Sequence, residues 1–170
     1  MTFEEFVATR LPAVLRFAAV LAGDRALAED LAQEVLIRAY ARWERIGGLD
    51  QPEFYVRKMI LNEFLSWRRR SWRLIPAGDI GAAPDRAEPD HAHQYAEREA
   101  LLAELSKLPR RQRAVLVLRY YEGRGDADIA ELLGCTPGTV RGYASRALAA
   151  LRVELKPTPS RGPAYIEGKS

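Results

Sequence analysis

The sequence has little of what many enzymes and secreted proteins need. It contains one cysteine, Cys135, in 170 residues, so no disulfide forms within the chain, which favours a reducing, cytoplasmic location. Its two histidines, His91 and His93, have no cysteine or further histidine to complete a metal site. We find no glycine-rich phosphate loop and no histidine placed for triad chemistry. We therefore expect no enzyme activity, no cofactor, no metal and no small-molecule substrate.

Long apolar runs are also missing. Glu4 and Glu5 stand where a secretory signal would place basic and then apolar residues. No stretch approaches the roughly 20 apolar residues of a membrane-spanning helix. Hydrophobic residues nevertheless make up 48% of the chain. The sequence predicts one or two small packed domains and no membrane insertion.

Charge is unevenly distributed, although the net charge is only +3. Residues 57–73 carry six basic side chains and one acidic side chain, and residues 110–156 carry nine basic and five acidic. The segment between them, residues 74–109, carries seven acidic side chains against three basic. Two basic blocks with an acidic spacer indicate two separate contacts with nucleic acid.

A change of composition divides the chain. Proline, glycine and acidic residues gather after Leu74 and break the helical pattern. They predict a flexible acidic linker, residues 74–93, between domains at 1–73 and 94–156. The proline- and glycine-rich residues 157–170 predict a disordered tail. The expected fold class is all-α, with two small helical domains.

A helix-turn-helix pattern begins at Asp126 in the C-terminal half. Its first helix ends at Gly134, a residue that tolerates the left-handed backbone of a helix end. Thr136 and Pro137 are typical of the N-cap and first position of a second helix, which we expect to reach Arg152. In this motif the second helix enters the DNA major groove with its N-terminal residues. The candidate DNA contacts are Thr139, Arg141, Tyr143 and Arg146.

Three arginines, Arg110, Arg111 and Arg113, occupy the first turn of a helix expected to start near Pro109. The helix dipole normally favours acidic side chains there. The cluster indicates an anionic partner such as phosphate, and Arg113 joins the candidate DNA contacts. The competing interpretation is an ordinary three-helix bundle with a solvated basic face.

Three helices are expected in the N-terminal half. They run from Phe3, after the capping box of Thr2 and Glu5, then from Arg25 to about Arg45, and from about Glu53 to Trp72. The second helix carries a continuous polar face made of Asp30, Gln33, Glu34 and Arg38. From the residues alone, a solvated helix face is preferred to a protein-docking surface. The third helix ends in a basic run with interleaved tryptophans, which suits phosphates and unpaired bases.

Together these blocks resemble the extracytoplasmic-function (ECF) sigma factors of bacterial RNA polymerase, and most of all the SigE-like group of actinobacteria. In region two the resemblance rests on Ala28–Trp43 and Phe54–Arg70. In region four it rests on Leu108–Gly123 and Asp128–Arg152. Four such blocks in this order are far more specific than any one of them.

The resemblance implies a promoter-specificity subunit with two partners, the RNA polymerase core and promoter DNA. It reverses the preference for a merely solvated face on the second helix, since Asp30, Gln33, Glu34 and Arg38 would dock on the core. The residues that would recognise and open the −10 element are Trp43, Asn62, Trp67, Arg68, Arg69 and Arg70. The residues that would contact the −35 element are Arg113, Thr139, Arg141, Tyr143 and Arg146. An anti-sigma factor as a further partner is left open.

Two stretches depart from the pattern of the family. Arg124-Gly125-Asp126 stands where the first motif helix usually opens with Ser or Thr, and Gly142-Tyr143 replaces the frequent Ser and Arg. A rival interpretation is a freestanding helix-turn-helix repressor or activator, which would bind duplex DNA without polymerase and normally as a dimer. An enzyme or a pure interaction adaptor is the third and weakest alternative.

Overall fold

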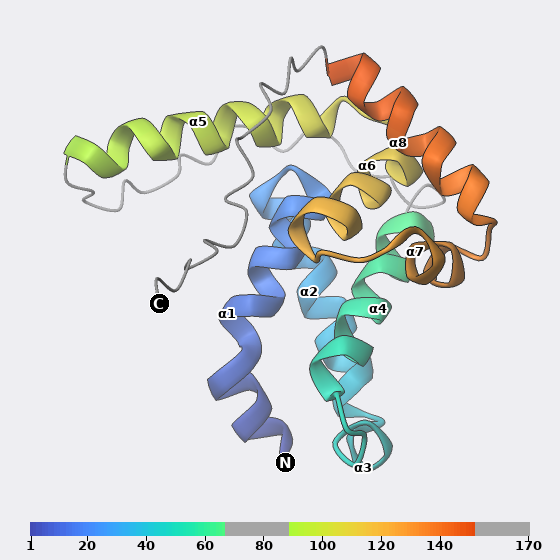
Figure 1. Cartoon of the computed structure of the whole chain (residues 1–170). Helices are drawn as coiled ribbons and strands as arrows, with labels where there is room; N and C mark the ends of the chain where they lie inside the picture. Colours follow the sequence, from blue (N-terminus) through green and yellow to red (C-terminus); the bar gives the residue numbers. More distant parts are fainter. Residues whose placement is uncertain (67–88, 152–170) are drawn as a thin grey trace, which may run out of the picture.

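The computed structural model describes residues 1–66 and 89–151, with only the backbone given for 89–93, and these residues form helices and turns without any strand. The N-terminal unit consists of α1 (Phe3–Ala22), α2 (Arg25–Tyr40), α3 (Trp43–Ile46) and α4 (Pro52–Ser66). The C-terminal unit consists of α5 (Pro89–Ser106), α6 (Arg110–Leu116), the π-helical turn η3 (Val117–Tyr121), α7 (Asp126–Leu133) and α8 (Pro137–Leu151). Figure 1 shows α6 and α7 between α4 and α8, while α5 lies across the end of α1.

The predicted helix starts in the N-terminal unit are present. The Thr2 hydroxyl accepts a hydrogen bond from the Glu5 N–H at 3.2 Å, and the Glu5 carboxylate accepts one from the Thr2 N–H at 2.8 Å. Asp24 caps α2 by accepting a hydrogen bond from the N–H of Leu27 at 3.1 Å. The expected capping box is confirmed, and α2 begins at Arg25 as predicted.

The second helix is shorter than predicted. It ends at Tyr40 rather than near Arg45, and a separate single turn, α3, follows. The break lets Trp43 turn back onto α1, where its ring meets Phe3 and Phe6 edge-on or tilted. Burying this aromatic contact against α1 favours the break over a continuous helix.

The structure moves one boundary of the expected linker. The helix α5 begins at Pro89, inside the segment 74–93 that composition assigned to the linker. The remainder of that segment, the end of the third predicted helix from Trp67, and the predicted tail lie outside the described residues. None of the described helices combines the length and apolar character needed to cross a bilayer.

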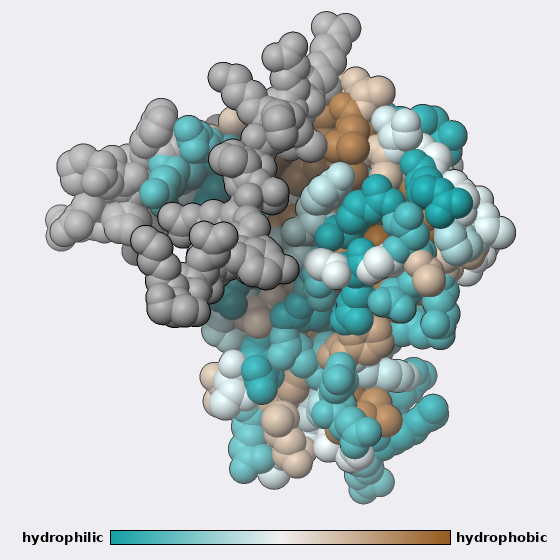
Figure 2. All heavy atoms as spheres, in the orientation of Figure 1, coloured by the Kyte–Doolittle hydropathy of each residue, from teal (hydrophilic) through white to brown (hydrophobic). Residues whose placement is uncertain are grey.

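The two units pack against each other around one main core. Fully buried side chains from the N-terminal unit, such as Phe17 and Phe64, belong to the same apolar cluster as Leu118 and Ile129 from the C-terminal unit. A smaller cluster lies where α5, α6 and α8 meet and consists of Leu105, Leu108, Leu116 and Ala147, with Leu148 and Leu151 against it. Figure 2 shows hydrophobic residues at the surface between α5 and the end of α8. Composition predicted two units, but it did not predict a shared core.

The helix-turn-helix is formed as predicted. The helix α7 ends at Gly134, whose φ of 64° lies in the left-handed region that glycine tolerates. The Thr136 hydroxyl accepts a hydrogen bond from the N–H of Thr139 at 3.2 Å and so caps α8. The helix α8 is described as far as Leu151, one residue short of the predicted end.

Candidate nucleic-acid and protein interfaces

The helix α8 has one buried side and one exposed side. Val140, Ala144 and Ala147 are buried against α6 and α7 at three- and four-residue spacing. This packing turns Thr139, Arg141 and, one turn further on, Arg146 outward; these three residues are exposed, and Tyr143 is half-buried. The exposed side of α8 therefore offers hydroxyl and guanidinium donors at one surface, as base readout in a major groove requires.

The exposed donors of α8 have partners within the C-terminal unit, and the hydroxyl of Thr139 lies 2.9 Å from that of Thr136. The side chain of Arg141 is 64% exposed, and its Nη1 lies 3.8 Å from a carboxylate oxygen of Asp126 at the start of α7. The same carboxylate accepts a hydrogen bond from Arg119, and this bond raises the pKa of Arg119 above its ordinary value. The guanidinium of Arg146 lies 5.3 Å from the centre of the Tyr143 ring. Asp126 thus tethers Arg141 loosely, and Tyr143 supports Arg146.

Arg113 does not lie with the other candidate DNA contacts. Only 6% of the residue is exposed, and its guanidinium donates hydrogen bonds of 2.7–3.1 Å to four backbone carbonyls. Burial lowers the pKa of this guanidinium from its ordinary value, and the nearby charge of Arg110 lowers it further. The sequence predicted a DNA contact at Arg113, but in this arrangement the side chain faces the protein interior and cannot reach DNA.

The predicted −10 residues are described only in part. Asn62 is exposed on α4. Trp43 is half-buried, packs on α1, and donates its indole N–H to the carbonyl of Met1 at 3.0 Å. The structure gives Trp43 a packing role, and base contact by Trp43 remains a prediction. The other predicted −10 residues, Trp67, Arg68, Arg69 and Arg70, lie outside the described residues.

The polar face of α2 is present on the surface. Asp30 and Gln33 are exposed, and Glu34 and Arg38 are half-buried. Arg38 donates a hydrogen bond to Glu63 of α4, an acid that is only 8% exposed. One member of the predicted docking face is therefore also a link between α2 and α4.

Sequence reasoning missed two residues beside the candidate sites. Tyr40 is 62% exposed at the end of α2, close to the 64% exposed Ile37, and together they add apolar surface to the polar face. Because the second helix was predicted to continue past Tyr40, exposure of this side chain was not expected. Asp126 was assigned only to the start of a helix, because no local pattern links it with Arg119 or Arg141.

The described residues show no alternative centre of metal chemistry. They contain no group of three or more His, Cys, Asp or Glu side chains that could ligate an ion. Cys135 is half-buried in the turn between α7 and α8. His91 and His93 fall on the α5 backbone, and their side chains are not described.

Both units match family models, and most of the chain is similar to known proteins. Residues 6–74 match the family model "Sigma-70 region 2", and residues 98–151 match "Sigma-70, region 4". The RNA polymerase sigma-E factor of Streptomyces avermitilis is 38% identical over 157 residues, which is 92% of this chain and 86% of that protein. The ECF RNA polymerase sigma factor SigL of Mycobacterium tuberculosis H37Rv is 36% identical over 146 residues, which is 83% of this chain and 81% of that protein.

A solved structure agrees with these matches. The sigma factor RpoE of Bartonella quintana, crystallised in complex with the anti-sigma factor NepR, is similar with a TM-score of 0.61 and 26% identity. The similarity covers 88% of this chain and 94% of that chain. With both sigma regions matched and relatives alike over most of its length, the chain belongs to the sigma-70 family of RNA polymerase sigma factors, in the ECF group.

Proposed function

This sigma factor directs RNA polymerase to promoters for transcription initiation, and we propose that three of its surfaces bind three different partners. The face of α2 formed by Asp30, Gln33, Glu34 and Arg38 docks on the polymerase core. The helix α4 and the basic residues after it contact the −10 element, and the first two turns of α8 read the −35 element. The chemistry of RNA synthesis belongs to the polymerase.

The exposed side of α8 carries the proposal most directly. A buried apolar stripe fixes the orientation of the helix, while Thr139, Arg141 and Arg146 remain accessible to a ligand. Arginine forms bidentate hydrogen bonds with guanine in the major groove, the commonest specific contact between protein and DNA. A freestanding regulator would use the same helix, but it would not need the docking face on α2.

Run-off transcription with purified core on a panel of promoters tests the function as a whole. We expect promoter-specific transcripts only when both the core and this chain are present. Tight binding of the chain alone to duplex operator, without any stimulation of transcription, would favour the freestanding regulator instead.

A core pull-down tests the docking face separately. Replacing Asp30 and Glu34 together with alanine should reduce core retention while leaving the helical circular dichroism unchanged. Glu29→Ala is the matched control, because Glu29 is an exposed acid on the same helix whose described contact is a pair with Arg25. Undiminished retention of the double variant would reject this face as the docking site.

An anti-sigma factor is a further partner that we propose. The basis is the Bartonella relative, whose structure contains its sigma factor bound to NepR. Co-purification of the tagged chain from its native host, followed by loss of transcription on adding the captured protein, would support this partner.

A further inference from the structure

Three charged side chains from three elements meet beside the helix-turn-helix. Asp126, the first residue of α7, accepts a hydrogen bond at its Oδ1 atom from Arg119 of η3. Its other carboxylate oxygen, Oδ2, lies 3.8 Å from Nη1 of Arg141 in α8. One carboxylate therefore connects the candidate base reader Arg141 with an arginine on another element of the same unit.

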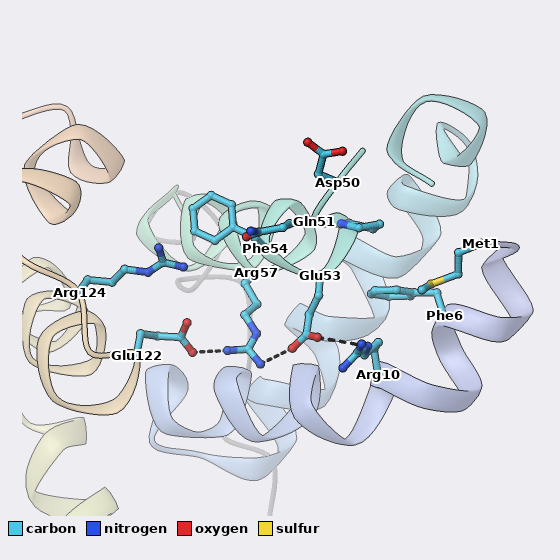
Figure 3. Close-up of a pocket in the computed structure, with 11 residues that line it drawn as sticks. Met1, Phe6, Arg10, Asp50, Gln51, Glu53, Phe54, Arg57, Glu122 and Arg124 are labelled. Atoms are coloured by element: carbon cyan, nitrogen blue, oxygen red, sulfur yellow. Dashed lines mark hydrogen bonds and ion pairs between the residues drawn. The ribbon is translucent and has the colours of Figure 1, made fainter. Parts of the chain in front are cut away.

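The arginines of this structure are held to different degrees. Figure 3 shows Arg57, whose guanidinium lies between Glu53 and Glu122 at the edge of a cavity of about 360 Å³ and pairs with both acids. The side chain of Arg57 is 21% exposed, whereas that of Arg141 is 64% exposed. The 3.8 Å that separates Arg141 from Asp126 also exceeds the length of a hydrogen bond. Arg141 is thus guided by a charge while its N–H groups can still donate to DNA.

The guanidinium of Arg141 lies over the first turn of its own helix. Long side chains of a helix lean toward its N-terminus and cover the preceding turn. A Cβ atom built on Gly138, three residues earlier, would lie 3.8 Å from Nη2 of Arg141. In a helix-turn-helix, the N-terminal residues of the second helix contact the base edges. Asp126 therefore lies beside the guanidinium at the end of α8 that approaches the bases.

An arginine at this place has two kinds of partner in DNA. It can form a bidentate pair with guanine, which depends on sequence, or contact a backbone phosphate, which does not. A carboxylate beside the guanidinium opposes the phosphate contact, because it repels the phosphate. It also restricts the rotamers of the arginine before binding, so less conformational entropy is lost when the guanidinium meets a base.

We propose that Asp126 is a positioning residue for promoter recognition, which is held by Arg119 and orients Arg141 toward the base edges of the −35 element. The inference rests on the proposed function, since it requires that α8 reads this element. Asp126 contacts no base in this role and acts through Arg141. Sequence discrimination then depends on three side chains in a row, of which only Arg141 touches DNA.

Two substitutions that change the net charge in opposite directions test this role. Asp126→Asn keeps the size of the side chain and removes its negative charge, whereas Arg119→Gln removes the positive charge that holds Asp126. Each variant is assembled with core polymerase and allowed to choose between promoters with single substitutions in the −35 element. Both should reduce discrimination at the position read by Arg141 about two- to fivefold, the range expected for an exposed ion pair. Arg141→Ala should reduce it further, because the contact itself is lost.

Affinity for DNA with a scrambled −35 element separates positioning from a general effect of charge. Asp126→Asn should raise this affinity and Arg119→Gln should lower it, since one removes a repulsion and the other an attraction. The matched control is Asp128→Asn, because Asp128 is an exposed acid in the same first turn of α7 with the same favourable position on the helix dipole. It should raise the affinity for scrambled DNA and leave discrimination unchanged.

A double substitution shows whether Asp126 acts through Arg141. In an Arg141→Ala background, Asp126→Asn should cause no further loss of discrimination, because no guanidinium is left to orient. A further two- to fivefold loss in that background overturns the positioning role, as does unchanged discrimination in an Asp126→Asn variant with normal helical circular dichroism. If Asp126→Asn lowers the circular dichroism, Arg119→Gln decides by the same criterion, since it leaves Asp126 in place.

The outcomes also separate this inference from the proposed function. If Arg141→Ala leaves discrimination unchanged, α8 does not read the −35 element through this residue, and both proposals are wrong. If Arg141→Ala reduces discrimination while Asp126→Asn and Arg119→Gln do not, the proposed function stands and only the positioning role is wrong.

Discussion

Arg113 shows how strongly one side chain's role depends on distant residues. Replacing it with methionine keeps most of its apolar stem but removes the charge and leaves four carbonyls without their donor. We expect a loss of about 3 kcal/mol in the free energy of unfolding, since orphaned buried groups each cost about 1–3 kcal/mol and water at the helix ends recovers part of this. Urea denaturation followed by circular dichroism measures it.

Arg25→Met is the control for that measurement. Arg25 is exposed and pairs with Glu29 one turn along α2, so its loss should change stability by less than about 0.5 kcal/mol. Equal effects of the two substitutions would show that Arg113 does not bind the helix ends in solution.

Arg141 is the residue on which base discrimination should depend. Arg141→Ala should reduce discrimination at one position of the −35 element by about 1–3 kcal/mol. The physical reason is the loss of a guanidinium that is exposed and only weakly tethered, with its Nη1 3.8 Å from Asp126. Competition between promoters with single substitutions, bound by the holoenzyme, provides the measurement.

A charge-matched control accompanies this prediction. Arg16→Ala removes the same charge from an exposed position on α1, outside the proposed DNA contacts. It should lower affinity for every promoter similarly or not at all. If Arg141→Ala does the same, Arg141 contacts phosphate and does not read a base.

The helix α8 contains a residue that weakens it. Gly142 lies in the helix interior, and a Cβ atom there would lie 3.6 Å from Arg146, an ordinary contact. Gly142→Ala should therefore raise the free energy of unfolding by about 0.5–1 kcal/mol through helix propensity. Thermal unfolding measures this change. The control is Ala149→Gly, at an exposed position of the same helix, which should lower the free energy of unfolding by a similar amount. A lower melting temperature for Gly142→Ala would mean that the position is more crowded than the structure shows.

The same helix shows which features a sequence reveals. The end of α7 and the start of α8 follow from Gly134, Thr136 and Pro137, whose effects extend only a few residues along the chain, and both were predicted to the residue. The exposed and buried sides of α8 follow equally well from spacing. Local chemistry and a recognisable family pattern were sufficient to predict the candidate recognition surface.

The partners of α6 could not be predicted in the same way. Arg113 and Leu21 are separated by 92 positions in the sequence, and carbonyl acceptors carry no side-chain signature. The arginine cluster predicted an anionic partner such as phosphate, whereas the described partners of these arginines are uncharged carbonyl oxygens at helix ends. The end of α2 was misjudged for a related reason, because Trp43 packs on Phe3, 40 positions earlier. Long-range packing outweighed the local helical pattern at that point.

The core that both units share predicts how many transitions the whole molecule shows when it unfolds. Because Phe17 and Phe64 pack in one cluster with Leu118 and Ile129, separating the units exposes apolar surface on both of them. The free chain should therefore unfold in a single transition with equal calorimetric and van't Hoff enthalpies, which is the test of two-state behaviour. Gly23→Ala should broaden or divide this transition, since it forces apart α1 and α5, whereas Gly134→Ala should only shift it to lower temperature. Two separate transitions in the wild-type chain would mean that the units fold independently and that the shared core contributes too little free energy to hold them together.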